Sequence, residues 1–122
     1  MAFRGDLDAL VLGVLTDGQK HGYEITQIIN HVGRVDAGTV TVREGQLYPI
    51  LHKLENDELI EAQWREQTGK PARKVYRLTN KGQAALEEKR LAWQHFVKAV
   101  NTLIAPPSPP TLPEMPGVKT YA

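Results

Sequence analysis

Residues 41–60, TVREGQLYPILHKLENDELI, have the hydrophobic spacing of an amphipathic helix. The apolar positions recur three and four residues apart and so share one face: Leu47, Ile50, Leu51 and Leu54. The stretch also contains Pro49, which inside a helix removes one backbone hydrogen bond and costs roughly 3 kcal/mol. A helix that keeps a proline at such a cost is a candidate for a functional surface.

The start and the exposed face of this helix also follow from the sequence. Thr41 and Glu44 fit a capping box, in which each side chain binds the other residue's backbone amide. The face opposite the leucines is small or polar and consists of Gly45, Gln46, Pro49, His52, Lys53 and Asn56, with Tyr48 on the flank. The pattern predicts a helix with one face in a core and the other available to a ligand.

Two further helices are predicted before it. Residues 6–15 carry apolar side chains at helical spacing, and Asp17-Gly18 ends that helix. Residues 22–32 repeat the spacing, and Gly33 is placed to end the second helix in a left-handed conformation. With a turn at residues 36–38, the second and third helices form a helix-turn-helix.

After Leu59 the hydrophobic period changes from 3.6 to 2, which indicates strands. Residues 60–66 and 73–78 are the predicted strands, joined by a turn at residues 67–71. Tyr76 and Leu78 are the inward pair of the second strand. A lone hairpin is marginal in water, so this one is expected to pack against the helices.

The last predicted helix begins at a cap on Thr79 or Asn80 and runs to about Ile104. Its apolar face is wider than one small domain needs: Leu86, Trp93, Phe96, Val97, Val100, Leu103 and Ile104. The proline-rich residues 105–122 cannot continue the helix. They indicate a disordered tail or extended polyproline II structure.

Composition narrows the classes of function. The chain has 122 residues and no cysteine, which excludes disulfides and thiolate metal sites. No stretch has the length of a membrane span or the pattern of a signal peptide, so the expected location is the cytoplasm. The four histidines show no metal-ligand spacing and no nucleophile-base pair is evident, so no cofactor, metal or enzymatic activity is expected.

Charge is distributed unevenly although the formal net charge is only +1. Residues 1–58 hold five Lys/Arg against nine Asp/Glu, whereas residues 59–98 hold nine against four. The basic segment includes the predicted hairpin. It indicates either local binding of a polyanion or a solvated basic surface.

The order of elements predicts a mainly α (α+β) fold, a winged helix-turn-helix with an added long C-terminal dimerisation helix. The third helix is the candidate recognition helix, and the hairpin is the wing. The predicted organisation is a DNA-binding domain over residues 1–79, a dimerisation helix over 80–104 and a proline-rich tail over 105–122.

The residues themselves resemble the PadR family of bacterial transcriptional regulators, in its compact branch with a single C-terminal helix. The matching stretches are Leu7-Asp8-Ala9-Leu10, Leu12-Gly13, His21-Gly22-Tyr23-Glu24-Ile25, Leu47-Tyr48-Pro49, Leu54-Glu55, Lys74-Val75-Tyr76-Arg77-Leu78-Thr79 and Gly82. The resemblance implies a homodimer that represses transcription and is relieved by a small molecule. The chain departs from the family at Glu58, where the family usually has glycine. Asn56 or Asp57 is expected to adopt the left-handed conformation instead.

The predicted DNA-binding residues are Thr41, Arg43, Gln46, Tyr48, Pro49, His52, Lys53, Lys70, Arg73 and Lys74. Pro49 can approach a thymine methyl or sugar closely, and Gln46 can bind a base edge. His52 and Lys53 can reach phosphate or a base, and the Tyr48 hydroxyl can donate to a phosphate. Tyr48 as a packing residue and Pro49 as a tolerated kink are the alternatives.

Five basic residues of the hairpin can neutralise phosphates: Arg65, Lys70, Arg73, Lys74 and Arg77. Alternate strand residues point to opposite sides, so not all five can face DNA. Lys70, Arg73 and Lys74, near the tip, are the predicted contacts.

The predicted dimer and effector residues are Leu86, Trp93, Phe96, Val97 and Val100. Aromatic side chains that meet at a two-fold axis could line a pocket for a flat apolar effector. The alternative is that they are plain interface core. The expected function is a regulator that binds a pseudo-palindromic operator in double-stranded DNA; the alternative is a winged-helix module that binds protein and has no DNA target of its own.

Overall fold

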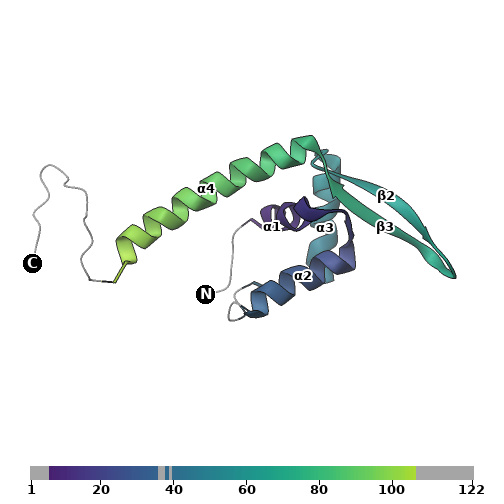
Figure 1. The fold of residues 1–122 in the computed structure, drawn as a ribbon, viewed down its shortest axis with the longest axis horizontal. Coiled ribbons are helices and arrows are strands. Elements are labelled where there is room, and N and C mark those ends of the chain that lie inside the picture. The colour runs from purple at the N-terminus through teal and green to yellow at the C-terminus, as the bar shows by residue number, and fades with distance from the viewer. Residues whose placement is uncertain (1–5, 36–37, 39, 107–122) are drawn as a thin grey trace, which may run out of the picture. The chain divides into compact units, whose positions relative to one another are not determined.

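The computed structural model describes residues 6–35, 38 and 40–106 (Figure 1). The helices are α1 (Leu7–Val14), α2 (Gly22–Val35), α3 (Glu44–Asn56) and α4 (Asn80–Ile104). The strands are β1 (Lys20–His21), β2 (Ile60–Gln67) and β3 (Lys70–Leu78). The chain forms two compact units, Met1–Arg90 and Leu91–Ala122. The first unit extends past the predicted boundary at residue 79 and includes the first turns of α4.

The predicted first helix is confirmed. The Asp6 side chain accepts from the Ala9 amide at 3.2 Å, which satisfies one of the unpaired amides at the start of α1. One turn of 3-10 helix, Leu15–Asp17, follows, and Gly18 ends it with φ of 141°.

The predicted end of the second helix is wrong. Gly33 lies buried within α2, which continues to Val35, and it does not adopt a left-handed conformation. The missing side chain of Gly33 instead lets the backbone of Val40 pack closely against α2, because a Cβ at residue 33 would collide with the carbonyl group of Val40. The turn predicted at residues 36–38 lies largely outside the described residues; the Gly38 amide donates to the Gly33 carbonyl at 2.7 Å.

The sheet has three strands in the order β1-β3-β2, so the predicted hairpin is confirmed but incomplete. Figure 1 shows the hairpin of β2 and β3. β1 pairs antiparallel with β3 through Lys20 opposite Tyr76 and His21 opposite Val75. Two residues are too few to show a period in sequence, so β1 could not be recognised there. The hairpin turn is also shorter than predicted: Thr68 and Gly69 alone form it, and Gly69 has φ of 71°.

The core of the first unit is assembled from all three short helices and the base of the hairpin: Val11, Leu12, Leu15, Ile25, Ile29, Val42, Leu47, Leu51, Leu54, Ile60 and Tyr76. The predicted inward pair of β3 is corrected in one respect. Val75 and Tyr76 are both buried, whereas Leu78 is half-buried at the edge of the core. Adjacent residues of a strand point to opposite faces of the sheet, and of these two only Tyr76 belongs to the core cluster.

The connection from α3 to the wing differs from the sequence-based expectation. Glu58 itself adopts the left-handed conformation, with φ of 63°, and neither Asn56 nor Asp57 takes it. The Leu59 amide then donates to the Leu54 carbonyl at 2.9 Å and closes the helix end.

Thr79, one of the two residues predicted to cap α4, is its N-cap. Its hydroxyl oxygen accepts from the Gly82 amide at 2.9 Å, and its own amide donates to the Leu59 carbonyl at 3.1 Å. A Cβ on Gly82 would collide with the same Leu59 carbonyl. The start of α4 is thereby fixed to the start of the wing. Within the part of the chain that the structure describes, none of the helices has the length and apolarity needed to span a membrane.

Candidate nucleic-acid interface

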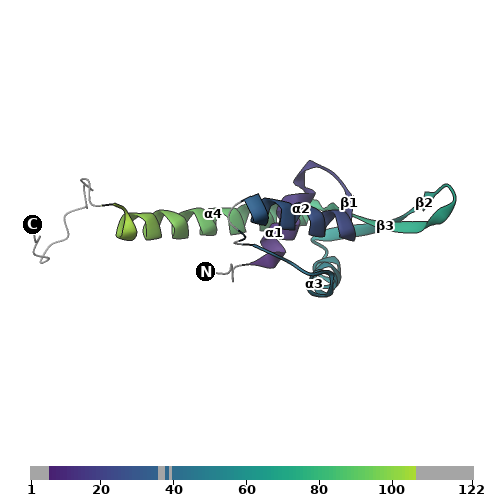
Figure 2. The same ribbon diagram turned by 90° about the horizontal axis from the view of Figure 1, so that it is seen from below.

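The third helix presents the two faces that its sequence predicts. Leu47, Leu51 and Leu54 are buried, while Pro49 and Lys53 are exposed on the other side. Figure 2 shows α3 nearly end-on, beside α1 and close to the base of the hairpin. The exposed face of α3 is thus on the same unit as the basic hairpin.

The exposed face of α3 is open beside Pro49, which lies one turn after Gly45. Pro49 has no amide hydrogen to donate to the Gly45 carbonyl, and Gly45 has no side chain. A Cβ built on Gly45 would meet nothing within 4 Å, so space at this position is open. Gly45, Pro49 and His52 together form a low and exposed strip along α3.

The predicted capping box on Thr41 is wrong. Arg43 is the N-cap of α3, with extended backbone, and Thr41 is an exposed residue two positions before it. The Gln46 side-chain oxygen accepts from the Arg43 amide at 3.0 Å. This oxygen caps the helix, so the group of Gln46 that remains to donate to a base edge is its amide nitrogen.

A pair of hydrogen bonds that sequence reasoning missed sets the entry of the chain into α3. The Asn30 side chain of α2 donates to the Val42 carbonyl at 2.9 Å, and the Val42 amide donates to Asn30 Oδ1 at 2.7 Å. Val42 itself is buried. An asparagine at a half-buried helix position was the available signal, but nothing in the sequence names its partner twelve residues away.

Tyr48 lies at the edge of the exposed face and contacts the start of α2. Its side chain is about half exposed. A Cβ on Gly22 would stand 3.0 Å from Cε1 of Tyr48 and 3.2 Å from its hydroxyl oxygen, so the ring lies directly on Gly22. His21 caps α2 at this point, since its Nδ1 accepts from the Glu24 amide at 3.2 Å.

Two lysines of the predicted DNA-binding set are paired with carboxylates. Lys53 Nζ lies 2.8 Å from Asp8 Oδ2 of α1, and this hydrogen bond and the Asp8 charge raise the pKa of Lys53. Lys74 Nζ lies 3.3 Å from Glu55 Oε1 of α3 and 5.5 Å from the ring centre of Tyr76. Burial raises the pKa of Tyr76 above its ordinary value. Lys74 therefore joins the middle of β3 to α3.

The two faces of the wing carry different side chains. Arg65 and Arg73 stand directly opposite each other, and in the same row Arg77 is paired with Glu61 at 3.2 Å. The exposed indole of Trp64 stands opposite Lys74 on the other face. Arg73 and Lys74 thus face opposite ways.

The partners of the wing arginines differ. The Gln67 side-chain oxygen accepts from Arg73 Nε at 2.7 Å in the amide orientation that satisfies both groups. Among the residues that the structure describes, no carboxylate pairs with Arg65 or Lys70. Among the described cationic side chains of the wing, these two therefore have the greatest freedom to meet an anion.

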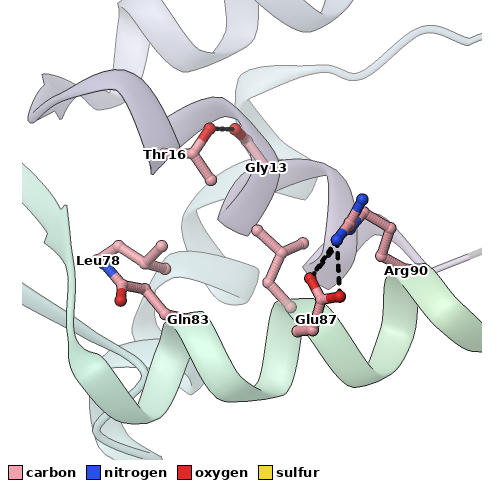
Figure 3. Close-up of a pocket in the computed structure, with 7 residues that line it drawn as sticks. Gly13, Thr16, Leu78, Gln83, Glu87 and Arg90 are labelled. Atoms are coloured by element: carbon pink, nitrogen blue, oxygen red, sulfur yellow. Dashed lines mark hydrogen bonds and ion pairs between the residues drawn. The ribbon is translucent and has the colours of Figure 1, made fainter.

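An open cavity of about 420 Å³ lies between α1, the end of β3 and the first turns of α4 (Figure 3). It is lined by Gly13, Thr16, Leu78, Gln83, Leu86, Glu87 and Arg90. Figure 3 shows the Arg90 guanidinium bound to the Glu87 carboxylate and the Thr16 hydroxyl donating to the Gly13 carbonyl. Leu86 packs against the core of its own chain, and its predicted dimer or effector role stays a prediction.

The remaining predicted dimer and effector residues belong to the second unit. The rings of Trp93 and Phe96 have centroids 5.6 Å apart with planes tilted by 34°. Both side chains are at least half exposed, and Val97 and Val100 are half-buried. Over residues 6–35, 38 and 40–106, no group of three or more His, Asp or Glu side chains is arranged to hold a metal ion.

Comparison with known proteins agrees with this fold. Residues 11–88 match the family described as "Transcriptional regulator PadR-like family". Transcriptional regulator Rv3488 of Mycobacterium tuberculosis is 40% identical over 91 residues, which cover 74% of this chain and 78% of that protein.

Solved structures give the same relationship. A PadR-like transcriptional regulator from Bacillus cereus superposes with a TM-score of 0.70 at 30% identity, covering 82% of this chain and 92% of that one. Bacillus subtilis PadR in complex with operator DNA superposes with a TM-score of 0.58 at 30% identity, covering 67% of this chain and 45% of that one. The family match spans more than half of the sequence, and this chain belongs to the PadR-like family of transcriptional regulators.

Proposed function

We propose that this protein is a cytoplasmic, sequence-specific DNA-binding repressor that acts as a homodimer on a pseudo-palindromic operator. As a member of its family the chain is a transcriptional regulator and not an enzyme. The observation that carries the DNA-binding part is the exposed strip of α3, which lies on the same unit as a wing that carries exposed cations. Bacillus subtilis PadR, a structural relative, is bound to operator DNA.

In this proposal the exposed strip of α3 enters the major groove. Gly45 and Pro49 have low profiles, so the helix backbone can approach base edges and the thymine methyl group. The Gln46 amide nitrogen and His52 supply donors to base edges, and Lys53 supplies charge to a phosphate. Thr41, Arg43 and the Tyr48 hydroxyl flank the strip and bind the backbone on either side.

The wing contacts phosphate through the face that carries Arg65 and Arg73. Two guanidinium groups directly opposite each other repel in the free protein, and a phosphate between them removes that cost. Lys70 extends the same charge to the turn. Lys74, which is bound to Glu55, acts in positioning the wing rather than in contacting DNA.

The homodimer and the effector site rest on the second unit. Trp93 and Phe96 are in contact and expose apolar surface that one small unit cannot cover, and Val97 and Val100 extend it along α4. Pairing of two such helices across a two-fold axis would bury this surface. A flat apolar effector that enters between the aromatic rings would change the spacing of the two recognition helices and release DNA.

The proposal is tested by selecting bound sequences from a pool of random DNA with the full chain. The expected product is an inverted repeat whose half-sites are separated by about one helical turn, roughly 10 base pairs. Its affinity should exceed that of a mixed-sequence duplex by about 10³-fold or more. Sedimentation of the free protein at the mass of two chains is expected alongside.

The alternative, a winged-helix module that binds protein, makes a different prediction. It would leave the selected pool without a common sequence, and binding to any duplex would vanish near physiological salt. Recovery of an inverted repeat excludes it. A Pro49→Ala variant then tests the strip, because unchanged affinity and unchanged ranking of operator variants would remove Pro49 from the reading surface.

A further inference from the structure

Lys53, which is exposed on α3 next to the strip of Gly45, Pro49 and His52, is held by Asp8 in the first turn of α1. The ion pair joins Lys53 Nζ to Asp8 Oδ2 over 2.8 Å. The Lys53 side chain is 63% exposed, whereas that of Asp8 is only 18% exposed. The carboxylate is therefore the fixed member of the pair, and the ammonium is the member that can turn toward another anion.

The turn that carries Asp8 is anchored independently of Lys53. The neighbouring Asp6 accepts from the Ala9 amide and forms an ion pair with Lys89 of α4. A carboxylate in the first turn of a helix is also favoured by the helix dipole. The turn that carries Asp8 consequently keeps its place when Lys53 leaves it.

We propose that Asp8 is an internal competitor of DNA phosphate for Lys53 and so sets the affinity of the protein for DNA. The inference rests on the proposed function, since it needs α3 to approach the DNA backbone. A phosphate oxygen and a carboxylate oxygen offer an ammonium group the same charge-assisted hydrogen bond. Both anions cannot stay close to one ammonium without repelling each other, so binding of DNA loosens the internal pair.

The consequence is a lysine contact that contributes less than a free lysine would. An exposed ion pair of this kind must be broken before Lys53 binds phosphate, which lowers the equilibrium constant for DNA binding by a factor of about two to five. Removal of the Asp8 charge should therefore tighten DNA binding by that factor. The tighter binding must depend on Lys53. This dependence distinguishes it from the effect of losing a negative charge anywhere on the protein.

Asp6 provides a matched control. Asp6→Asn and Asp8→Asn remove the same charge from the same turn, and asparagine keeps the shape of the side chain. Asp6, however, is paired with Lys89 and not with Lys53. A long-range electrostatic effect would be similar in both variants, whereas competition for Lys53 is confined to Asp8.

The experiment measures binding of the full chain to a mixed-sequence DNA duplex by fluorescence anisotropy, over a series of salt concentrations. Phosphate contacts carry no sequence information, so the operator is not needed. The variants are Asp8→Asn, Asp6→Asn, Lys53→Gln and the double variant Asp8→Asn with Lys53→Gln. Thermal unfolding confirms that each variant is folded. If Asp8→Asn does not fold, Asp8→Ser takes its place, because serine keeps a hydrogen-bond acceptor in the first turn of α1.

We expect Asp8→Asn to bind about two- to fivefold more tightly than the wild type, Asp6→Asn to change affinity much less, and the gain to vanish in the Lys53→Gln background. Equal gains in the two aspartate variants, or a gain that persists without Lys53, would overturn the inference. A wild-type protein that binds no duplex at any salt concentration would instead overturn the proposed function.

Discussion

The phenol ring of Tyr48 in α3 lies against Gly22, the first residue of α2. A Cβ built on Gly22 would stand 3.0 Å from Tyr48 Cε1, closer than ordinary van der Waals contact. Gly22 is buried, and the ring covers it from outside. The glycine thus sets the position of a residue at the edge of the proposed DNA-binding surface.

This contact predicts that a substitution at Gly22 weakens DNA binding while leaving the stability of the fold almost unchanged. Gly22→Ala should push the Tyr48 ring outward by a few tenths of an ångström, with little change in the free energy of unfolding because the ring is half exposed. Operator binding should weaken by about 1 kcal/mol, since one hydrogen bond to phosphate is misplaced. In a Tyr48→Ala background, Gly22→Ala should have no effect on binding; an equal loss in both backgrounds would show that the contact is irrelevant.

A second prediction concerns the approach of Val40 to α2. Gly33→Ala should lower the free energy of unfolding by about 2–3 kcal/mol, because its Cβ collides with a backbone carbonyl that cannot move freely. Chemical denaturation of the variant gives the value. Gly45→Ala, whose Cβ meets nothing within 4 Å, is the helical control and should not destabilise. A Gly33→Ala protein as stable as the wild type would contradict the observed packing.

Glu58 is the third test, because a side chain at φ of 63° is strained. Glu58→Gly should raise the free energy of unfolding by about 0.5–1 kcal/mol, as relief of about 1–2 kcal/mol exceeds the entropy that glycine adds to the unfolded chain. Glu58→Ala removes the same charge without relieving the backbone. Stabilisation by alanine and glycine alike would assign the effect to charge.

The cross-strand pair of Arg65 and Arg73 predicts that a change at Arg65 can stabilise the fold and at the same time weaken DNA binding. Arg65→Glu replaces a like-charged cross-strand pair by an opposite one and should stabilise the fold by about 0.2–1 kcal/mol. The same change should weaken DNA binding and reduce the slope of log affinity against log salt by about 1 for each phosphate that the wing no longer neutralises. Arg77→Gln is the control on the same face, since Arg77 is already paired with Glu61. Arg65→Gln, which like Arg77→Gln removes one positive charge, is the matched comparison. A larger loss of affinity in Arg77→Gln than in Arg65→Gln would place the DNA elsewhere.

Acid sensitivity tests the anchor of α1. Burial opposes ionisation of Asp6, but its bonds to Lys89 and to the Ala9 amide prevail and hold its pKa below the ordinary value of 3.8. The contribution of Asp6 to the free energy of unfolding is therefore complete above pH 3.8 and is lost as the pH falls through the lower pKa that Asp6 has in the folded state. In urea titrations at about pH 7 and about pH 3, Asp6→Asn should lose less stability on acidification than the wild type. Equal losses would mean that Asp6 does not contribute.

The sequence by itself determined what depends on local periodicity. The leucine face of α3 is visible because residues three and four apart share one side of a helix. The two long strands are visible because alternate residues share one side of a strand. Pro49 and Gly45 could be placed on the exposed side by the same counting, and the motifs shared with the PadR family identified the winged helix-turn-helix.

The tertiary structure alone decided which distant groups meet. Asn30 binds Val42, Gly33 admits Val40 and Lys53 is held by Asp8, and none of these pairs has a signature within a single element. Glu58 takes the left-handed conformation because the chain must turn there to bring Leu59 to both Leu54 and Thr79, against its own preference. Such contacts depend on where folded elements come together, and local preferences, worth at most about 1 kcal/mol for residues other than proline, yield to them.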